Sequence, residues 1–564
     1  MKVARRVGMR RRLSGALMAT VALVLGTGIT IGSVAPATAA PSYVPISGQG
    51  STWSENALDQ WISDVQQYGM RINYDGDGST TGRQAYISGT TDFAASDIPF
   101  QTNPNDGSAP EDPTPNSYAY MPVTAGGTVF MYNLTIAGQR VTNLRLSGQN
   151  IAKIFTGQIT NWNNPAIAAD NPALALPNEP IVPVVRSDGA GSSFEFSEWM
   201  INQYPSVWNQ FCNATGRAPA CGPTSFWPTT PTIPMIAQSG DLGVAGYVAQ
   251  NYAAGSIGYV EYSYALNAKF PVVNMLNAAG YYTEPTPQNV AVSLLQAQIN
   301  MDSSNPAVYL TENLSNVYTD PDPRTYPLSS YSYLILPTKV QGQFTTNKGA
   351  TLAAFSYYAM CQGQQDSASL GYSPMPINLV QASFAQIAKI PGAVTQNINI
   401  QSCNNPTFSS TGQNLLAVDA PQPPACDKKG PTQCTTATGG ATAATPVSGS
   451  KKAAGVNPAS SASQTPSSQS GATTGTTVPG SSTSTTVATA TPGSTSDSAP
   501  GVSKQSKALE RILNASPFPS AATLSGDHGW TLNQVLIVLV TAAVLGVIVI
   551  PGLVSRRLRK RRPS

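Results

Sequence analysis

Residues 43–98 alternate between short apolar runs and stretches of helical periodicity. Three runs have the length and composition of strands, namely residues 43–46, 70–74 and 92–95. Between the first two, apolar residues recur at helical spacing, with Ser54 as a candidate N-cap and Gly69 as the stop. The same order returns later, with candidate strands at 181–186 and 256–262. A β-α-β-α-β order predicts an α/β fold built on a parallel sheet that helices cover.

Four loops follow the predicted strands, at residues 48–53, 76–80 and 96–99 and after Arg186. Ligands of open parallel sheets bind beyond the carboxyl ends of the strands. Three of these loops combine glycine with Ser or Thr and open a helix, whose free N–H groups favour oxyanions. Arg186 adds a planar charged group suited to phosphate or carboxylate. Taken alone, each loop is explained by an ordinary helix cap or turn, and Arg186 with Asp188 is explained by an ordinary surface ion pair. The occurrence of four such loops at equivalent positions of one α/β pattern predicts an anion site.

The charge of the chain is unevenly distributed. Residues 41–425 contain 12 Lys and Arg against 24 Asp and Glu, a net charge of −12, whereas the whole chain has a net charge of +3. A body this acidic does not bind nucleic acid through bulk charge. The single histidine is His528, outside that body. Histidine-based catalytic triads and most zinc sites are therefore excluded from the body, for which we expect no catalytic residues, metal or cofactor.

Six cysteines in a chain with an export signal indicate disulfides. Six cysteines permit 15 pairings. The spacing of the cysteines along the chain matches no metal-binding pattern. Proximity along the chain favours Cys212–Cys221 and Cys426–Cys434, which leaves Cys361–Cys403.

Both ends of the chain carry membrane-related signals. Residues 1–40 have a basic start, an apolar stretch and a small-residue cleavage motif, as a signal peptide does. Residues 426–531 are rich in Ser, Thr, Pro and Ala and are expected to be a disordered linker. Residues 532–554 are almost entirely apolar and long enough to span a bilayer, and the basic tail 555–564 is expected to remain cytoplasmic. The body is then extracellular, on a single-pass anchor.

The body also resembles a known family. The stretches ISGQGSTW, YDGDGSTTGRQ, TTDFAASDIPF, IFTGQITNWNNPAI, VVRSDGAGSSFEF and SIGYVEYSYAL resemble, in order, those of the PstS-type phosphate-binding proteins of ABC phosphate import. The chain looks like a membrane-anchored, actinobacterial-like variant. This resemblance implies a class II periplasmic-binding-protein fold over 41–425. One lobe would comprise 41–122 and 263–425, the other 123–262, and both would close over one dehydrated phosphate.

The resemblance implies a role for each of eight residues. Five would donate hydrogen bonds to phosphate, from hydroxyl or N–H groups: Thr52, Trp53, Ser79, Gly191 and Ser192. Arg186 would bind phosphate through charged hydrogen bonds, while Asp188 holds its guanidinium group. Asp97 would accept a hydrogen bond from a phosphate O–H, because an ionised carboxylate can only accept hydrogen bonds. Sulfate carries no such proton near neutral pH and would be repelled.

The sequence departs from the family pattern at three places. Ala190 stands where the family has Ser or Thr, which removes one side-chain donor. Trp53 and Ser54 replace the usual Phe and Pro. The expected C-terminal membrane helix differs from the free or lipidated form of many relatives.

Three functions remain open at this stage. The first is phosphate capture for an ABC-type permease, with hinges near residues 121–124 and 258–262 and a monomeric body. The second is a surface module that acts as a phosphate sensor, an adhesin or a binder of another oxyanion. The third is a phosphatase or hydrolase. Against this function, the body has no histidine to act as a base, and the sequence has no G-x-S-x-G motif.

Overall fold

The computed structural model describes residues 43–396, 398, 400, 403–409, 411–437, 445–446 and 455–456. The predicted signal peptide 1–40, most of the predicted linker, the predicted membrane helix 532–554 and the basic tail 555–564 lie outside these residues. Among the helices of the described residues, none combines the length and the apolar character needed to cross a bilayer.

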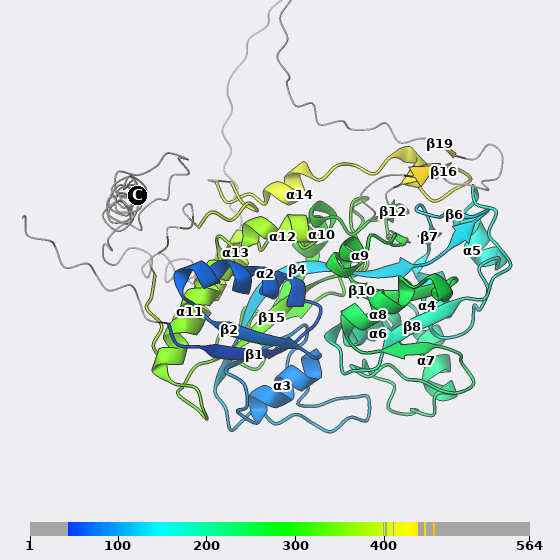
Figure 1. Ribbon diagram of the computed structural model, residues 1–564. Helices are drawn as coiled ribbons and strands as arrows, with labels where there is room; N and C mark the ends of the chain where they lie inside the picture. The colour runs from blue at the N-terminus through cyan, green and yellow to red at the C-terminus, as the bar shows by residue number, and fades with distance from the viewer. Residues whose placement is uncertain are drawn as a thin grey trace, which may run out of the picture. The chain divides into compact units, whose positions relative to one another are not determined.

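The centre of the fold is an eight-stranded sheet with the order β2-β1-β3-β15-β4-β10-β8-β9 (Figure 1). Its strands are β1 (Ile46–Gly50), β2 (Ile72–Gly76), β3 (Phe93–Ser96), β4 (Tyr118–Tyr132), β8 (Val182–Arg186), β9 (Ile236–Gln238), β10 (Ser256–Glu261) and β15 (Ser329–Pro337). We call β1, β2, β3 and β15, with the helices that pack on them, the first half, and β8, β9 and β10 with theirs the second half.

The sheet is mixed rather than fully parallel. Strand β1 pairs in parallel with β2 and β3, and β8 pairs in parallel with β9 and β10, as the sequence pattern predicts. Strand β15 is antiparallel to both β3 and β4, and β10 is antiparallel to β4. The parallel pairing is therefore confirmed for the strands from which it was predicted. The antiparallel neighbours come from β4 and β15, which the pattern did not include, because β15 comes from far along the chain and inserts beside β3.

Strand β4 runs through both halves. Its residues 118–127 pair with β15, and residues 128–132 pair with β10. The change of partner occurs between Gly127 and Thr128, whereas the segment 121–124 that the sequence suggested as a hinge lies inside the pairing with β15. The second suggested segment, 258–262, covers the end of β10 and the first residue of helix α9 (Tyr262–Ala268).

Helices cover the sheet on both faces. The first half carries α2 (Glu55–Val65), α3 (Ser79–Ile87), α11 (Thr346–Met360), α12 (Gln364–Leu370) and α13 (Ile377–Ile387). The second half carries α4 (Gly148–Phe155), α5 (Pro165–Asp170), α6 (Gly191–Gln203), α7 (Pro205–Ala214) and α8 (Gly240–Val248). Helix α2 buries Leu58, Trp61, Ile62 and Val65, the periodic residues of the sequence, and Gly69 follows it with φ of 83°. In Figure 1, α2 and α3 lie on opposite sides of β1 and β2.

Smaller elements complete the described chain. Strand β11 (Asn274–Leu276) pairs with β7 (Arg145–Leu146) and β12 (Tyr282–Thr283), and β13 (Gln298–Ile299) pairs with β14 (Glu312–Asn313). Two-residue pairs form between β5 (Thr135–Ile136) and β6 (Gln139–Arg140), β16 (Gln433–Cys434) and β19 (Gly455–Val456), and β17 (Thr436–Ala437) and β18 (Thr445–Pro446). The short helices are α10 (Pro287–Ser293) and α14 (Leu415–Asp419).

All three predicted disulfides are present: Cys212–Cys221, Cys361–Cys403 and Cys426–Cys434. The last closes a loop that packs on the second half, although the sequence assigned these residues to the linker. Arg145, 1% exposed in its side chain, donates to Asp427 Oδ1 at 2.7 Å and to the carbonyl of Thr432 at 3.0 Å. The packed body therefore continues beyond residue 425, because buried Arg145 finds its partners there.

Candidate anion-binding site

The loops predicted to hold an anion meet where the two halves touch. A β-carbon built on Gly191, at the start of α6, would lie 2.6 Å from Oδ2 of Asp97, at the end of β3. One built on Gly78, before α3, would lie 2.7 Å from Oδ2 of Asp188, after β8. The two glycines thus allow the loops of the first half to approach those of the second half without a side chain between them.

Arg186 is the buried cation of this site, at 2% exposure. Its Nε donates to Asp188 Oδ1 at 2.8 Å, and Nη2 donates to the same carboxylate and to Thr52 Oγ1 at 2.9 Å. Its Nη1 donates to Asp241 and, at 3.4 Å, to Ser192 Oγ. Burial alone would lower the pKa of Arg186, but the charges of Asp241 and Asp188 outweigh it and raise the pKa. Burial opposes ionisation of Asp188 as well, yet Arg186 lowers the pKa of Asp188 overall.

Asp241 is a site residue that the sequence analysis missed. Its side chain has no exposed surface, and it accepts hydrogen bonds from Thr52 Oγ1 at 2.5 Å, from Arg186, and from the N–H of Glu261 at 2.8 Å. It lies in the first turn of α8, which follows β9. Ser239 and Gly240 precede it, so the strand, glycine and helix order of the other loops is a signal that could have found it.

Asp97 is the second carboxylate that faces the meeting point, at 3% exposure. Its Oδ1 accepts hydrogen bonds from Ser51 Oγ at 2.6 Å and Ser332 Oγ at 2.8 Å, and its Oδ2 accepts one from Ser79 Oγ at 3.1 Å. Burial raises the pKa of Asp97, although the three serine hydroxyls act in the opposite direction. Ser51 and Ser332 were not predicted, and no local pattern announces Ser332, which reaches Asp97 only because β15 lies beside β3.

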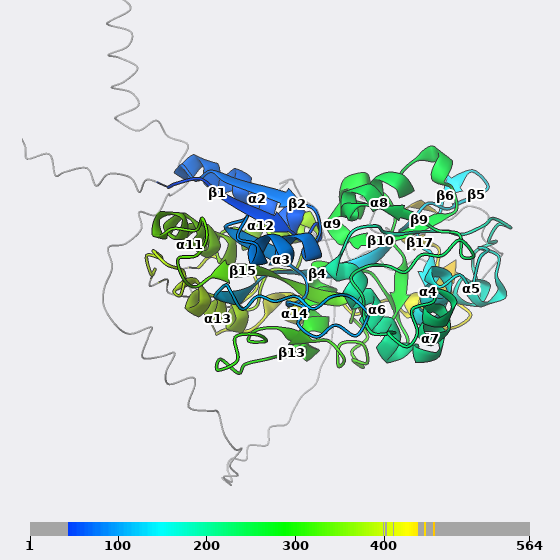
Figure 2. The same ribbon diagram turned by 90° about the horizontal axis from the view of Figure 1, so that it is seen from below.

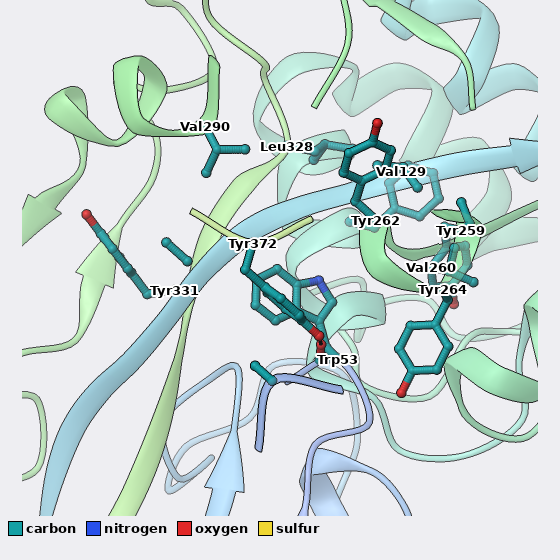
Figure 3. Close-up of a cluster of buried hydrophobic side chains, with 14 of the residues drawn as sticks. Trp53, Val129, Tyr259, Val260, Tyr262, Tyr264, Val290, Leu328, Tyr331 and Tyr372 are labelled. Carbon is teal, nitrogen blue, oxygen red and sulfur yellow. Dashed lines mark hydrogen bonds between the residues drawn. The ribbon is translucent and has the colours of Figure 1, made fainter. Parts of the chain in front are cut away.

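The turn at Thr52 and Trp53 is held by an aromatic cluster at the centre of the sheet (Figure 3). Tyr264 donates to the carbonyl of Thr52 at 2.6 Å, and Tyr372 donates to that of Trp53 at 2.7 Å. The Trp53 ring contacts Tyr372 edge to face and donates through Nε1 to Thr128 Oγ1 at 3.1 Å. The backbone N–H of Trp53 donates to Ser51 Oγ at 3.1 Å. Trp53 therefore ties the loop to β4 at the point where that strand changes partner.

Three helices begin at the site without a capping hydrogen bond from their own N-cap residues. The N-cap residues of α3, α6 and α8 are Gly78, Ala190 and Ser239, and none of them makes a side-chain capping hydrogen bond. The first N–H groups of a helix lack partners inside the helix and carry partial positive charge. At α8 the N–H groups of Gly240 and Asp241 donate to Asp188 Oδ1 and Thr52 Oγ1 at 2.9 and 3.3 Å, and at α3 the N–H of Thr80 donates to the carbonyl of Gly189 at 2.9 Å. The start of α6, together with Arg186, is therefore the part of the site that suits an oxyanion.

Comparison with known proteins identifies the family of the chain. The model of the PBP superfamily domain matches residues 35–362. A phosphate-binding protein PstS of Xylella fastidiosa is 31% identical over 342 residues, which cover 60% of this chain and 83% of the relative.

This chain belongs to the PstS family of phosphate-binding proteins.

Further PstS proteins are similar over comparable lengths. The one from Haemophilus influenzae is 29% identical, with 60% of this chain and 92% of the relative covered. Phosphate-binding protein PstS 2 of Mycobacterium tuberculosis is 29% identical, with 58% and 82% covered. Among solved structures, a high-affinity periplasmic phosphate-binding protein (PfluDING) bound with phosphate covers 64% of this chain and 99% of its own, at 19% identity and a TM-score of 0.46.

In this PstS-family protein, Ala190 has a structural role even without a hydroxyl. It is 2% exposed and its N–H donates to the carbonyl of Ser225 at 2.9 Å, which fixes the loop before α6. Because a methyl group cannot cap the helix, the N–H groups of Ser192 and Ser193, which an N-cap side chain would bond, face no such competition. Over the residues that the structure describes, no cluster of three or more His, Cys, Asp or Glu is arranged to hold a metal ion.

Proposed function

We propose that this protein binds inorganic phosphate outside the cell membrane and delivers it to an ABC-type phosphate permease. One observation carries this proposal: a buried Arg186, held by Asp188 and Asp241, lies across the meeting point of the two halves from a buried Asp97. An arginine beside the N-terminus of α6 attracts an oxyanion, whereas a nearby carboxylate favours an oxyanion that still carries a proton. Phosphate meets both conditions near neutral pH.

Binding would proceed by closure of the two halves over the anion. The hydroxyls of Thr52 and Ser79, which donate to Asp241 and Asp97 in this structure, would turn to the anion and donate to it. The start of α6 at Gly191 and Ser192 would donate as well, together with Arg186. Asp97 would accept a hydrogen bond from the phosphate O–H and disfavour sulfate, which has no such donor near neutral pH. Because the anion contacts loops from both halves only when they are together, it shifts the population towards the closed form. We place the hinge at Gly127 and Thr128, where β4 changes partner, and at the end of β10.

The cellular context follows from the ends of the chain. We propose that the body is extracellular, as the signal peptide implies, and that it acts as a monomer on a single-pass anchor formed by residues 532–554. The linker separates the body from the membrane. We assign no catalytic step and no cofactor, since the relatives that this chain matches are named as binding proteins.

The test is a binding titration of residues 41–437, which include the disulfide loop that Arg145 needs. After carried-over phosphate is removed, phosphate, arsenate and sulfate are titrated by calorimetry. We expect phosphate and arsenate to bind and sulfate to give little heat. Arg186→Ala should weaken every oxyanion, while Arg71→Ala, an exposed arginine in the first half, serves as the matched control. Absence of phosphate binding by the native body would overturn the proposal.

A further inference from the structure

A second set of contacts joins the two halves away from the anion site. The loop of residues 97–117, between β3 and β4, extends from the first half towards the second (Figure 2). Asn105 accepts a hydrogen bond through its carbonyl from the N–H of Gly222 at 2.9 Å. The Asp106 carbonyl accepts one from Arg217 Nη2 at 3.1 Å, and Asp106 Oδ2 accepts one from Thr224 Oγ1 at 2.7 Å. Three hydrogen bonds therefore connect this loop with residues 217–224 of the second half.

The loop is firmly attached to the first half. Glu111 forms an ion pair with Arg83 at 2.8 Å, and their side chains are 9% and 1% exposed. Asn116 donates to the carbonyls of Tyr86 and Ile87 at 3.0 and 2.7 Å. Arg83, Tyr86 and Ile87 all belong to α3, the helix that begins at the anion site with Ser79. A displacement of the loop would therefore also displace α3.

The opposite segment is equally attached to the second half. The Cys212–Cys221 disulfide joins it to α7, and Trp208 Nε1 donates to the carbonyl of Cys221 at 2.8 Å. The N–H of Thr224 donates to Ser197 Oγ at 2.9 Å, and Ser197 lies on α6. Since α6 begins at the anion site with Gly191, the contact links the two helices that frame the site.

Residues 105–106 and the segment 217–224 are complementary in shape and in charge. A β-carbon on Gly222 would lie 2.5 Å from Cβ of Asn105, so only glycine allows this approach. Asp106 is aimed by its own turn, in which Ser108 donates to it through N–H and Oγ, both at 2.9 Å. Burial alone would raise the pKa of Asp106. The hydrogen bonds from Thr224 and Ser108 and the charge of Arg217 outweigh burial, and the pKa of Asp106 is lowered. Asp106 is thus ionised and oriented at neutral pH.

We propose that residues 105–106 and 217–224 form a latch that holds the two halves closed and slows release of the bound anion. The inference rests on the proposed phosphate-binding function. Contacts between the halves exist only in the closed form, so they lower its free energy relative to the open form and add to the affinity of any ligand that requires closure. Their loss should act mainly on dissociation, because the latch forms after the anion has entered.

The test compares two aspartates of the same loop. Asp106→Asn weakens the bond to Thr224, and Asp112→Asn is the matched control, since exposed Asp112 accepts only local bonds from Thr114. We expect phosphate to dissociate roughly 5- to 50-fold faster from Asp106→Asn, with an almost unchanged association rate, because the neutral amide weakens but does not abolish hydrogen bonds that a charged acceptor strengthens. Asp112→Asn should match the native protein. Equal dissociation rates in all three proteins would overturn the latch.

A second measurement needs no ligand. Fluorophores on Tyr68→Cys and Tyr252→Cys, exposed positions of the first and second half, report the separation of the halves. Without phosphate, Asp106→Asn should shift the distance distribution towards more open forms, and Asp112→Asn should not. A distribution that Asp106→Asn leaves unchanged would contradict the latch even if phosphate were not the ligand. Failure of the native protein to bind phosphate would instead refute the proposed function alone.

Discussion

Replacement of Gly191 by alanine should block closure of the two halves without unfolding either. The added β-carbon would lie 2.6 Å from both Cβ and Oδ2 of Asp97. Non-bonded carbon atoms rest at about 3.5–4.0 Å, so the two loops must separate locally by roughly 1 Å. Asp97 cannot swing aside, because Ser51, Ser79 and Ser332 all hold its carboxylate. The strain therefore falls on the contact between the halves.

The expected magnitude follows from the hydrogen bonds that closure makes. A separation of roughly 1 Å stretches a bond of ordinary length beyond the range of effective hydrogen bonding. Each bond to a charged group contributes about 1.5–3 kcal/mol, so loss of two corresponds to about 3–6 kcal/mol. Phosphate affinity should accordingly fall by roughly 10² to 10⁴-fold.

The assay is calorimetric titration with phosphate, accompanied by thermal unfolding without ligand. Gly246→Ala in α8 is the control, since a β-carbon there meets no atom within 4 Å. The control should bind like the native protein. Gly191→Ala should keep its unfolding temperature in the absence of phosphate, because the open form accommodates the methyl group. Phosphate affinity within threefold of the native value would refute the idea that Gly191 and Asp97 close against each other.

Three further predictions concern selectivity, pH dependence and stability. Asp97→Asn should narrow the difference in affinity between phosphate and sulfate, because the amide no longer repels a fully ionised anion; an unchanged ratio in competitive titration would contradict the role of Asp97. Burial raises the pKa of Glu55 from 4.5 to about 7, so the folded state holds its proton more tightly than the unfolded state, and stability falls as pH rises from about 4.5 to 7 and then levels off. Glu55→Gln should therefore be more resistant to urea than the native protein at pH 8 but not at pH 4, and an equal gain at both would point to another cause. Truncation after Ala425 removes the partners of buried Arg145, which should cost about 3–5 kcal/mol and lower the unfolding temperature relative to a chain ending at residue 437; identical melting curves would show that the disulfide loop is dispensable.

Much of the site could be predicted from sequence because its signals are local. The helical spacing of Leu58 and Trp61 and the glycine that follows their helix are visible within a few turns of chain. Arg186 and Asp188 are two residues apart, and their ion pair needs only the turn after β8. The loops that precede α3 and α6 can be recognised in the sequence, because glycine lies directly before Ser79 and Ser192. In each case the physical cause, a helix N-terminus or a turn, lies within the residues that carry the pattern.

Other features depend on which distant segments become neighbours. Ser332 bonds to Asp97 across 235 positions because β15 inserts antiparallel beside β3. Asp241 reaches Arg186 only once β9 adds to the second half, and Arg145 is satisfied by a loop 282 positions away. Sequence alone determined the α/β order, the candidate anion-binding loops and the disulfide pairing favoured by proximity. Tertiary structure alone decided the order of the sheet, the partners of the buried charges and the contacts between the two halves. The free energy of each of these interactions depends on two distant segments together, so neither segment's own sequence reveals it.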